Sequence, residues 1–104
     1  MSSDFDGWRR KIDDIDRRLL ELLNERSRCA IEIGHIKKNR NLPAWSPERE
    51  AEILNQVAKA NRGPLDNGAI RRLFERIIDE ARAVERHAME NESKENPGSG
   101  KGSR

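Results

Sequence analysis

The sequence predicts an all-α protein with three helices per chain, one long, one short and one of medium length. Apolar residues recur at spacings of three and four along most of the 104 residues, which is the repeat of a helix. No stretch alternates apolar and polar residues in the way that a half-buried strand does. Residues that start and stop helices divide the chain at two points, so the helices are expected to number three.

The first helix is expected over residues 6–40, with Gly34 as its only weak interior position. At about 100° per residue, its apolar stripe runs through Leu19, Leu22, Leu23, Ala30 and Ile33. Arg26 lies about 20° from the centre of this stripe, and Lys37 lies directly on it. Cations on an apolar face are costly unless an anion meets them there. Both residues are therefore candidates for a specific role.

The second helix is expected to begin at the sequence SPERE. Ser46 suits the N-cap position, Pro47 suits the first helical position, and Glu48 complements the positive end of the helix dipole. Gly63 and Pro64 are expected to end this helix. Its apolar face includes Val57, and Glu50 projects about 20° from that residue.

The third helix is expected to begin around Asp66, as its N-cap, and to continue to about Asn91. Glu85 lies on the flank of its apolar face, in line with Phe74 and Ile78. Residues 1–91 are thus expected to form one helical domain. Residues 92–104 are polar and rich in Gly and Ser, so a disordered tail is predicted there.

The length of the first helix predicts a homodimer. A helix over 6–40 is roughly 50 Å long at 1.5 Å per residue, whereas a compact domain of about 100 residues has a radius of gyration near 13 Å. Two shorter helices cannot cover so long an apolar stripe. A second copy of the chain packed along it would do so.

The composition argues against several classes of partner. The net charge is +2 with acidic and basic residues interspersed, and aromatic residues are 4%, so a nucleic-acid-binding surface is not expected. No apolar run is long enough to span a membrane, and the N-terminus has no signal-peptide pattern. The single Cys29 suits a reducing compartment, so a cytoplasmic location is predicted. No Cys or His cluster has metal-ligand spacing, so no metal is expected.

Arg26, Lys37, Glu50 and Glu85 thus all point at or beside the core between the helices. One interpretation is an internal salt-bridge network in which the two acids neutralise the two cations. The other is a site for a small dianion gripped between Arg26 and Lys37, which are about 16 Å apart along the helix axis. Periodicity alone does not separate the two. Arg9 is about 25 Å from Arg26 on the same helix, so only the Arg9 of an antiparallel partner can reach that site.

The chain resembles a known family, the all-helical (AroQ-type) chorismate mutases, from Trp8 to Arg86. The resemblance rests on three segments, WRRKIDDIDRRLLELLNERSRCAIEIGHIKK, PAWSPEREAEIL and LDNGAIRRLFERIIDEARAVE. It implies an intertwined helical homodimer with two equivalent sites. It also implies the Claisen rearrangement of chorismate to prephenate, an isomerase reaction that needs no cofactor.

The resemblance also implies roles for individual residues. Arg26 would bind one substrate carboxylate, and Arg9 from the other protomer would bind the second. Lys37 would contact a carboxylate and the ether oxygen, and Glu50 would accept a hydrogen bond from the ring hydroxyl. Arg49 would help to organise the pocket.

Three substrate-contacting positions depart from the best-known pattern of the family. Ser46 stands where an Asp often lies near the substrate hydroxyl, and its main chain can still serve. Ala81 replaces a Ser and removes a minor polar contact. Glu85 replaces a Gln that donates to the ether oxygen, so Glu85 must be protonated to take that role.

Two other functions are compatible with the same residues. An isochorismate pyruvate-lyase would use equivalent Arg and Lys residues on the same scaffold, although Glu50, the partner of the ring hydroxyl, favours the mutase. A non-catalytic helical dimer would use the charges only for salt bridges.

Overall fold

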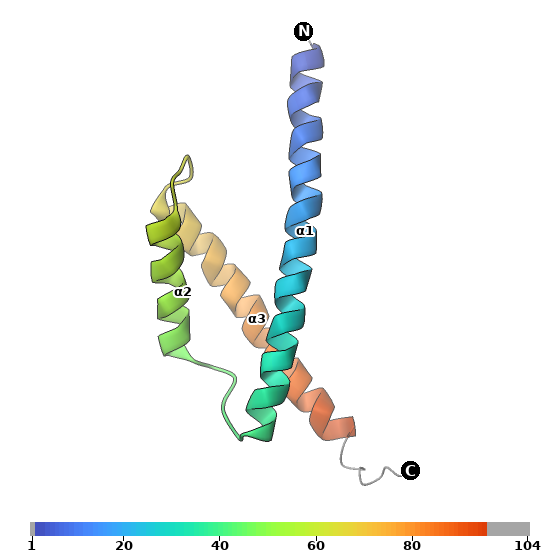
Figure 1. Ribbon diagram of the computed structural model, residues 1–104, viewed down its shortest axis with the longest axis vertical. Helices are drawn as coiled ribbons and strands as arrows, with labels where there is room; N and C mark the ends of the chain where they lie inside the picture. Colours follow the sequence, from blue (N-terminus) through green and yellow to red (C-terminus); the bar gives the residue numbers. More distant parts are fainter. Residues whose placement is uncertain (1, 96–104) are drawn as a thin grey trace.

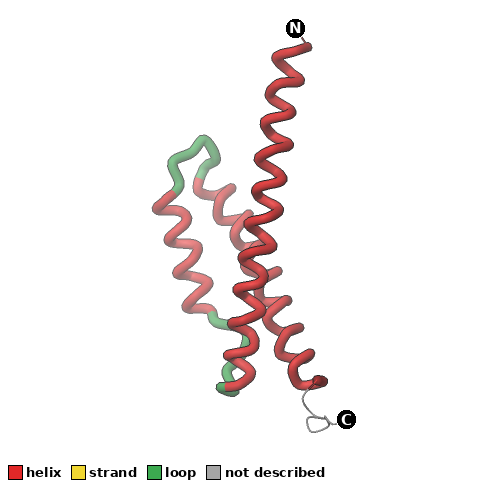
Figure 2. The backbone as a smooth tube through the Cα atoms, turned by 45° about the vertical axis from the view of Figure 1, so that its right-hand side comes forward, coloured by secondary structure: helices red, strands yellow, loops and turns green. Residues whose placement is uncertain are grey.

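The computed structural model describes residues 2–95 and contains three helices, α1 (Ser2–Asn39), α2 (Pro47–Ala60) and α3 (Asn67–Glu95) (Figure 1). No strand occurs within this range (Figure 2), so the predicted all-α fold class is confirmed. None of the helices is both long and apolar enough to cross a membrane. α1 begins four residues before the expected start, and α3 extends four residues past Asn91. Part of the predicted tail, 92–95, is therefore helical, while 96–104 lies outside the described residues.

α1 ends in a Schellman motif centred on Asn41. This residue has a φ of 58°, in the left-handed region that Asn tolerates better than most residues. The amide of Leu42 donates to the Lys37 carbonyl at 2.8 Å, and the amide of Asn41 donates to the Lys38 carbonyl at 3.2 Å. These two bonds satisfy carbonyls that the helix end leaves free. The motif reverses the chain, so the loop that follows returns past the last turn of α1.

The starts of α2 and α3 follow the predicted caps, with one difference. Asp66 caps α3, because its Oδ1 accepts a hydrogen bond from the Ala69 amide at 2.7 Å. Pro47 is the first residue of α2 and Ser46 is its N-cap, but the Ser46 side chain makes no capping hydrogen bond. Only the Ser46 carbonyl takes part, accepting the Glu50 amide at 3.1 Å. The hydroxyl of Ser46 is thus not used to start the helix.

The three helices form an open, elongated arrangement. α3 packs against both α1 and α2, whereas α1 and α2 stand apart from one another within the described chain (Figure 1). The N-terminal half of α1 projects beyond the other two helices (Figure 2). The radius of gyration is 18.8 Å, well above the value of about 13 Å for a compact domain of this size.

The hydrophobic core of one chain is small. Only Ala30, Ile78 and Ala88 are buried among the apolar residues described, and all three lie on α1 or α3. Large apolar side chains remain exposed along the projecting part of α1: Phe5, Trp8, Ile12, Ile15, Leu19, Leu20, Leu22 and Leu23. Folding of a single chain therefore leaves most of the α1 stripe in water, at a cost of about 25 cal/mol per Å².

Gly34 allows α1 and α3 to approach each other closely. A Cβ atom at this position would lie 2.8 Å from the carbonyl oxygen and 3.1 Å from the Cα of Glu85, and 3.3 Å from the Cβ of Ala88. Two of these atoms are backbone, so they cannot move aside without shifting α3. The residue that looks weakest for helix formation is thus required by packing.

We expect Gly34→Ala to destabilise the protein by about 1–2 kcal/mol, because overpacking costs about 1–3 kcal/mol and the gain in helix propensity returns at most about 1 kcal/mol. Thermal denaturation at fixed protein concentration measures the effect. Gly68→Ala is the matched control, since an added Cβ there lies 3.4 Å from side-chain atoms of Arg72 and Asp66. A melting temperature of Gly34→Ala equal to or above that of the wild type would contradict the packing argument.

Candidate active site

A cavity of 350 Å³ lies between α1 and α2 and is closed on a third side by α3. Its volume is in the range of pockets that hold small molecules. Every sequence-predicted site residue except Arg9 lines it. These residues are Arg26 and Lys37 from α1, Ser46 at the start of α2, Arg49 and Glu50 from α2, and Ala81 and Glu85 from α3.

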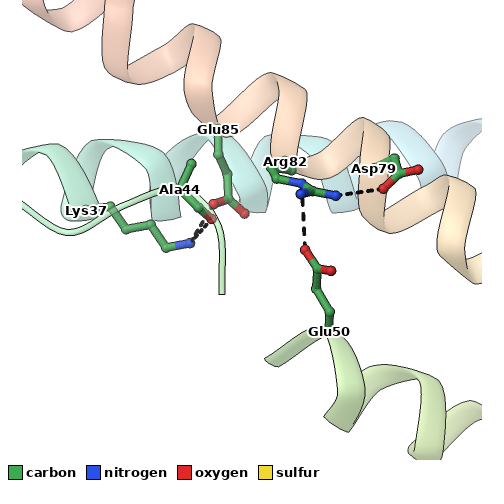
Figure 3. A network of polar contacts seen from close by, with 6 residues as sticks. All are labelled: Lys37, Ala44, Glu50, Asp79, Arg82 and Glu85. Carbon is green, nitrogen blue, oxygen red and sulfur yellow. Dashed lines mark hydrogen bonds and ion pairs between the residues drawn. The ribbon is translucent and has the colours of Figure 1, made fainter. Parts of the chain in front are cut away.

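Lys37 is held at the pocket by two acceptors. Its Nζ donates to Oε1 of Glu85 at 2.7 Å and to the Ala44 carbonyl at 2.9 Å (Figure 3). The Lys37 and Glu85 side chains are only 18% and 13% exposed. An ammonium group has three protons, so these contacts leave one proton of Lys37 for a bound molecule. The Ala44 contact depends on the chain reversal at Asn41, which returns the loop toward α1.

Glu50 pairs with neither Arg26 nor Lys37. Its Oε2 lies 3.7 Å from Nε of Arg82, and Nη2 of Arg82 donates to Oδ1 of Asp79 at 2.8 Å (Figure 3). The predicted salt-bridge network is thus correct for Lys37 and Glu85 and wrong for Glu50. The distance of 3.7 Å is longer than a hydrogen bond, so this contact leaves the Glu50 oxygens able to accept one.

Arg26 lines the pocket as a half-buried cation. None of the ion pairs found in residues 2–95 involves it. A partly desolvated guanidinium is costly without an anion beside it. The part of the salt-bridge interpretation that assigned Arg26 an acidic partner is therefore wrong for the described chain, and Arg26 is available to a ligand.

The other three predicted residues that line the pocket are Arg49, Ser46 and Ala81. Arg49 is exposed and pairs with Glu52 at 2.9 Å, one turn further along α2. Ser46 and Ala81 are half-buried in the pocket wall. The small side chain of Ala81 leaves space rather than a polar contact at its position.

Arg9 lies on the exposed N-terminal part of α1, outside the pocket of its own chain. Its guanidinium stacks over the Phe5 ring, with Cζ 3.9 Å from the ring centroid. This position agrees with the separation of about 25 Å from Arg26 that the helix rise predicts.

Among the pocket-lining side chains that carry a charge or a thiol, sequence reasoning missed Arg82 and Cys29. Arg82 follows Ile78 by four residues and precedes Glu85 by three, so helical spacing places it on the same flank of α3. That spacing is the signal that identifies it. Within residues 2–95, no three His, Cys, Asp or Glu side chains gather closely enough to hold a metal ion.

The charges of the pocket suit a small dianion. Four cationic side chains and two acidic ones line it, which leaves an excess of two positive charges: Arg26, Lys37, Arg49 and Arg82 against Glu50 and Glu85. Apolar side chains of Ile33, Ile53 and Ile78 form much of the rest of the wall. Such walls exclude water and so strengthen the attraction between the cations and a bound anion.

Comparisons with known proteins show which family the chain belongs to. A family model described as chorismate mutase type II matches residues 8–86. The chain is 40% identical over 80 residues to the bifunctional chorismate mutase/prephenate dehydratase of Stutzerimonas stutzeri, covering 72% of this chain but only 22% of that protein's length. It is 29% identical to the chorismate mutase of Methanocaldococcus jannaschii, covering 85% of this chain and 90% of that one. A solved structure of chorismate mutase from Thermus thermophilus superposes with a TM-score of 0.78 at 34% identity, covering 79% of this chain and 93% of that one. With matching helices, a matching sequence over most of its length and a cationic pocket between the helices, the chain belongs to the chorismate mutase type II family.

Proposed function

We propose that this protein converts chorismate to prephenate. The observation that carries the proposal is Arg26, a half-buried cation that lines the pocket without an acidic partner in the described chain. Chorismate is a dicarboxylate, so its negative charge complements the excess of positive charge in the pocket wall. The rearrangement is unimolecular and forms no bond to the protein.

The pocket can accelerate this reaction by restricting the substrate. The Arg26 guanidinium can bind one carboxylate through two parallel hydrogen bonds. Binding at both carboxylates would hold the flexible substrate in its reactive chair-like form, with the bond-forming carbons close together. Part of the barrier is thereby removed before the chemical step begins.

We assign to Lys37 and Glu85 the stabilisation of the charge that develops in the transition state. The remaining N–H of Lys37 would donate a hydrogen bond to the ether oxygen as the C–O bond breaks. Glu85 accepts from Lys37 through Oε1, so its Oε2 can carry a proton and act as a second donor. On the opposite wall, Glu50 would accept a hydrogen bond from the ring hydroxyl.

We further propose that the active form is a homodimer and that Arg9 of each chain completes the site of the other. The exposed apolar residues Phe5, Trp8, Ile12, Ile15, Leu19 and Leu22 alternate spacings of three and four, which is the pattern of a helix–helix seam. Arg26 is the next position of this series. An antiparallel pairing that sets Ile12 level with Leu22, and Ile15 level with Leu19, also sets Trp8 level with Arg26. Arg9 then lies one residue from the level of Arg26 in the partner, so one pairing can serve both the seam and the shared site.

A cytoplasmic location also belongs to this proposal. Cys29 is a free thiol in the structure. Free thiols persist in reducing compartments. Cell fractionation with an antibody against the chain would test the assignment.

A direct assay tests the function. Purified protein is incubated with chorismate, and separately with isochorismate, and the products are separated by chromatography. Prephenate from chorismate, without salicylate from isochorismate, is the expected result. Salicylate as the main product would assign the lyase function instead. If neither compound gives a product, the protein is not an enzyme of this kind and the charged residues have a structural role.

The pH dependence of the reaction tests the donor role of Glu85. Because Glu85 must carry a proton to donate to the ether oxygen, we expect kcat of the wild type to be higher in acidic than in neutral buffer. In Glu85→Gln the side-chain amide donates at every pH, so its kcat should not change with pH in this way. Glu75→Gln, on an exposed position of the same helix, should keep the wild-type profile. Parallel profiles for the wild type and Glu85→Gln would rule out the donor role.

A further inference from the structure

We propose that Arg82 is a positioning residue, which holds the Glu50 carboxylate at the pocket wall and offsets its charge when a dianionic substrate enters. This inference rests on the proposed function, because it assigns Arg82 a part in binding that substrate. It concerns a residue of α3 that contacts Glu50 and not the reacting atoms.

Two consecutive contacts connect Asp79 and Arg82 of α3 with Glu50 of α2. Asp79 accepts a hydrogen bond from Nη2 of Arg82 at 2.8 Å, which fixes one side of the guanidinium. Nε of Arg82 then faces Oε2 of Glu50 at 3.7 Å (Figure 3). The side chains of Arg82 and Glu50 are 29% and 26% exposed, whereas that of Asp79 is 56% exposed. Asp79, which holds the guanidinium, thus lies at the surface, whereas Arg82 and Glu50 lie at the pocket.

The length of the contact between Arg82 and Glu50 is important for this role. At 3.7 Å the two groups attract each other as charges but do not share a hydrogen bond. Arg82 can therefore orient the carboxylate without occupying the lone pairs that would accept the ring hydroxyl. A shorter contact would compete with the substrate for the same oxygen.

The charge of Glu50 explains why such a residue is needed. A carboxylate in the wall of a site for a dianion repels the ligand that the site must bind. Arg82 lies beside Glu50 and cancels this repulsion. Without Arg82 the cationic excess of the pocket wall would fall by one charge.

A double-mutant cycle tests the inference, with KM and kcat for chorismate measured for Arg82→Met, Glu50→Gln and the double variant. We expect Arg82→Met to raise KM about five- to twentyfold, the range expected when a partly buried charge loses its partner, with kcat changed much less. In the Glu50→Gln background no charge remains to be offset, so Arg82→Met should change KM less than twofold. Arg82→Lys keeps the positive charge, so its KM should be close to that of the wild type.

Arg76→Met is the matched control, because Arg76 pairs with Glu80 on the exposed side of the same helix. It should leave KM and kcat unchanged. Asp79→Asn removes the charge that holds the guanidinium without touching the pocket and should raise KM about two- to threefold, which keeps the inference testable if Arg82→Met does not fold.

The results separate this inference from the proposed function. If the wild-type protein makes no prephenate, both the proposed function and the role of Arg82 are wrong. Prephenate formation with an unchanged KM in Arg82→Met, or a loss that is as large in the Glu50→Gln background as in the wild type, would overturn the role of Arg82 alone.

Discussion

Replacing Lys37 by Met should lower kcat for chorismate by about 10²–10³-fold, the cost of removing one donor to a developing oxyanion. The contacts of Lys37 explain why the effect should be large. Glu85 and the Ala44 carbonyl hold its Nζ at 2.7 and 2.9 Å before substrate arrives, so no reorganisation is needed during the reaction. Stopped-flow or steady-state measurement of chorismate loss gives the rate.

Controls separate this catalytic effect from a loss of structure. Lys37→Met leaves the half-buried Glu85 without its cation, which by itself destabilises the fold. The double variant with Glu85→Gln removes that unpaired charge and should regain stability but not rate. Lys38→Met, at the adjacent exposed position, should keep kcat within about twofold. A folded Lys37→Met protein with wild-type kcat would exclude Lys37 from the reaction.

Mixing two inactive variants should restore activity if Arg9 acts across a dimer interface. Arg9→Ala and Lys37→Ala each disable both pockets of a homodimer. In a mixed dimer, one pocket combines the intact Lys37 of the first chain with the intact Arg9 of the second. With random exchange, half of the dimers are mixed and each has one complete pocket, so about a quarter of the wild-type activity should return.

The matching control is a mixture of Arg9→Ala with the double variant Arg9→Ala/Lys37→Ala. It forms the same dimers but has no intact Arg9, so it should stay inactive. Native mass spectrometry of chains of different mass verifies the exchange. If mixed dimers form and remain inactive, Arg9 does not serve the partner's pocket, and if only single chains are detected, the homodimer itself is wrong.

The helices could be predicted because they depend on local chemistry. Spacing at three and four residues identifies a helix from neighbouring residues alone, and Asp66 and Pro47 begin the helices where their chemistry suggests. The ends were less accurate, and α3 continues past Asn91. Helix ends depend on small differences in free energy, since the last turns have few tertiary contacts.

The candidate site could be predicted only as a set of residues on helix faces. Periodicity gives the angle of a side chain about its own helix axis, and this was enough to select Arg26, Lys37, Glu50 and Glu85. It gives no information about which residues of two helices meet. That Glu50 faces Arg82 depends on how α2 and α3 lie against each other.

The three helices and the charged residues that interrupt their apolar faces could thus be derived from the amino-acid order, because both follow from the 3.6-residue repeat. The packing of the helices sets the contacts of Lys37 with Glu85 and the Ala44 carbonyl, and it leaves Arg26 without an acid of the described chain. These pairings depend on where α1 crosses α3. The crossing is set by the close approach at Gly34, where the absence of a side chain lets two backbones come together.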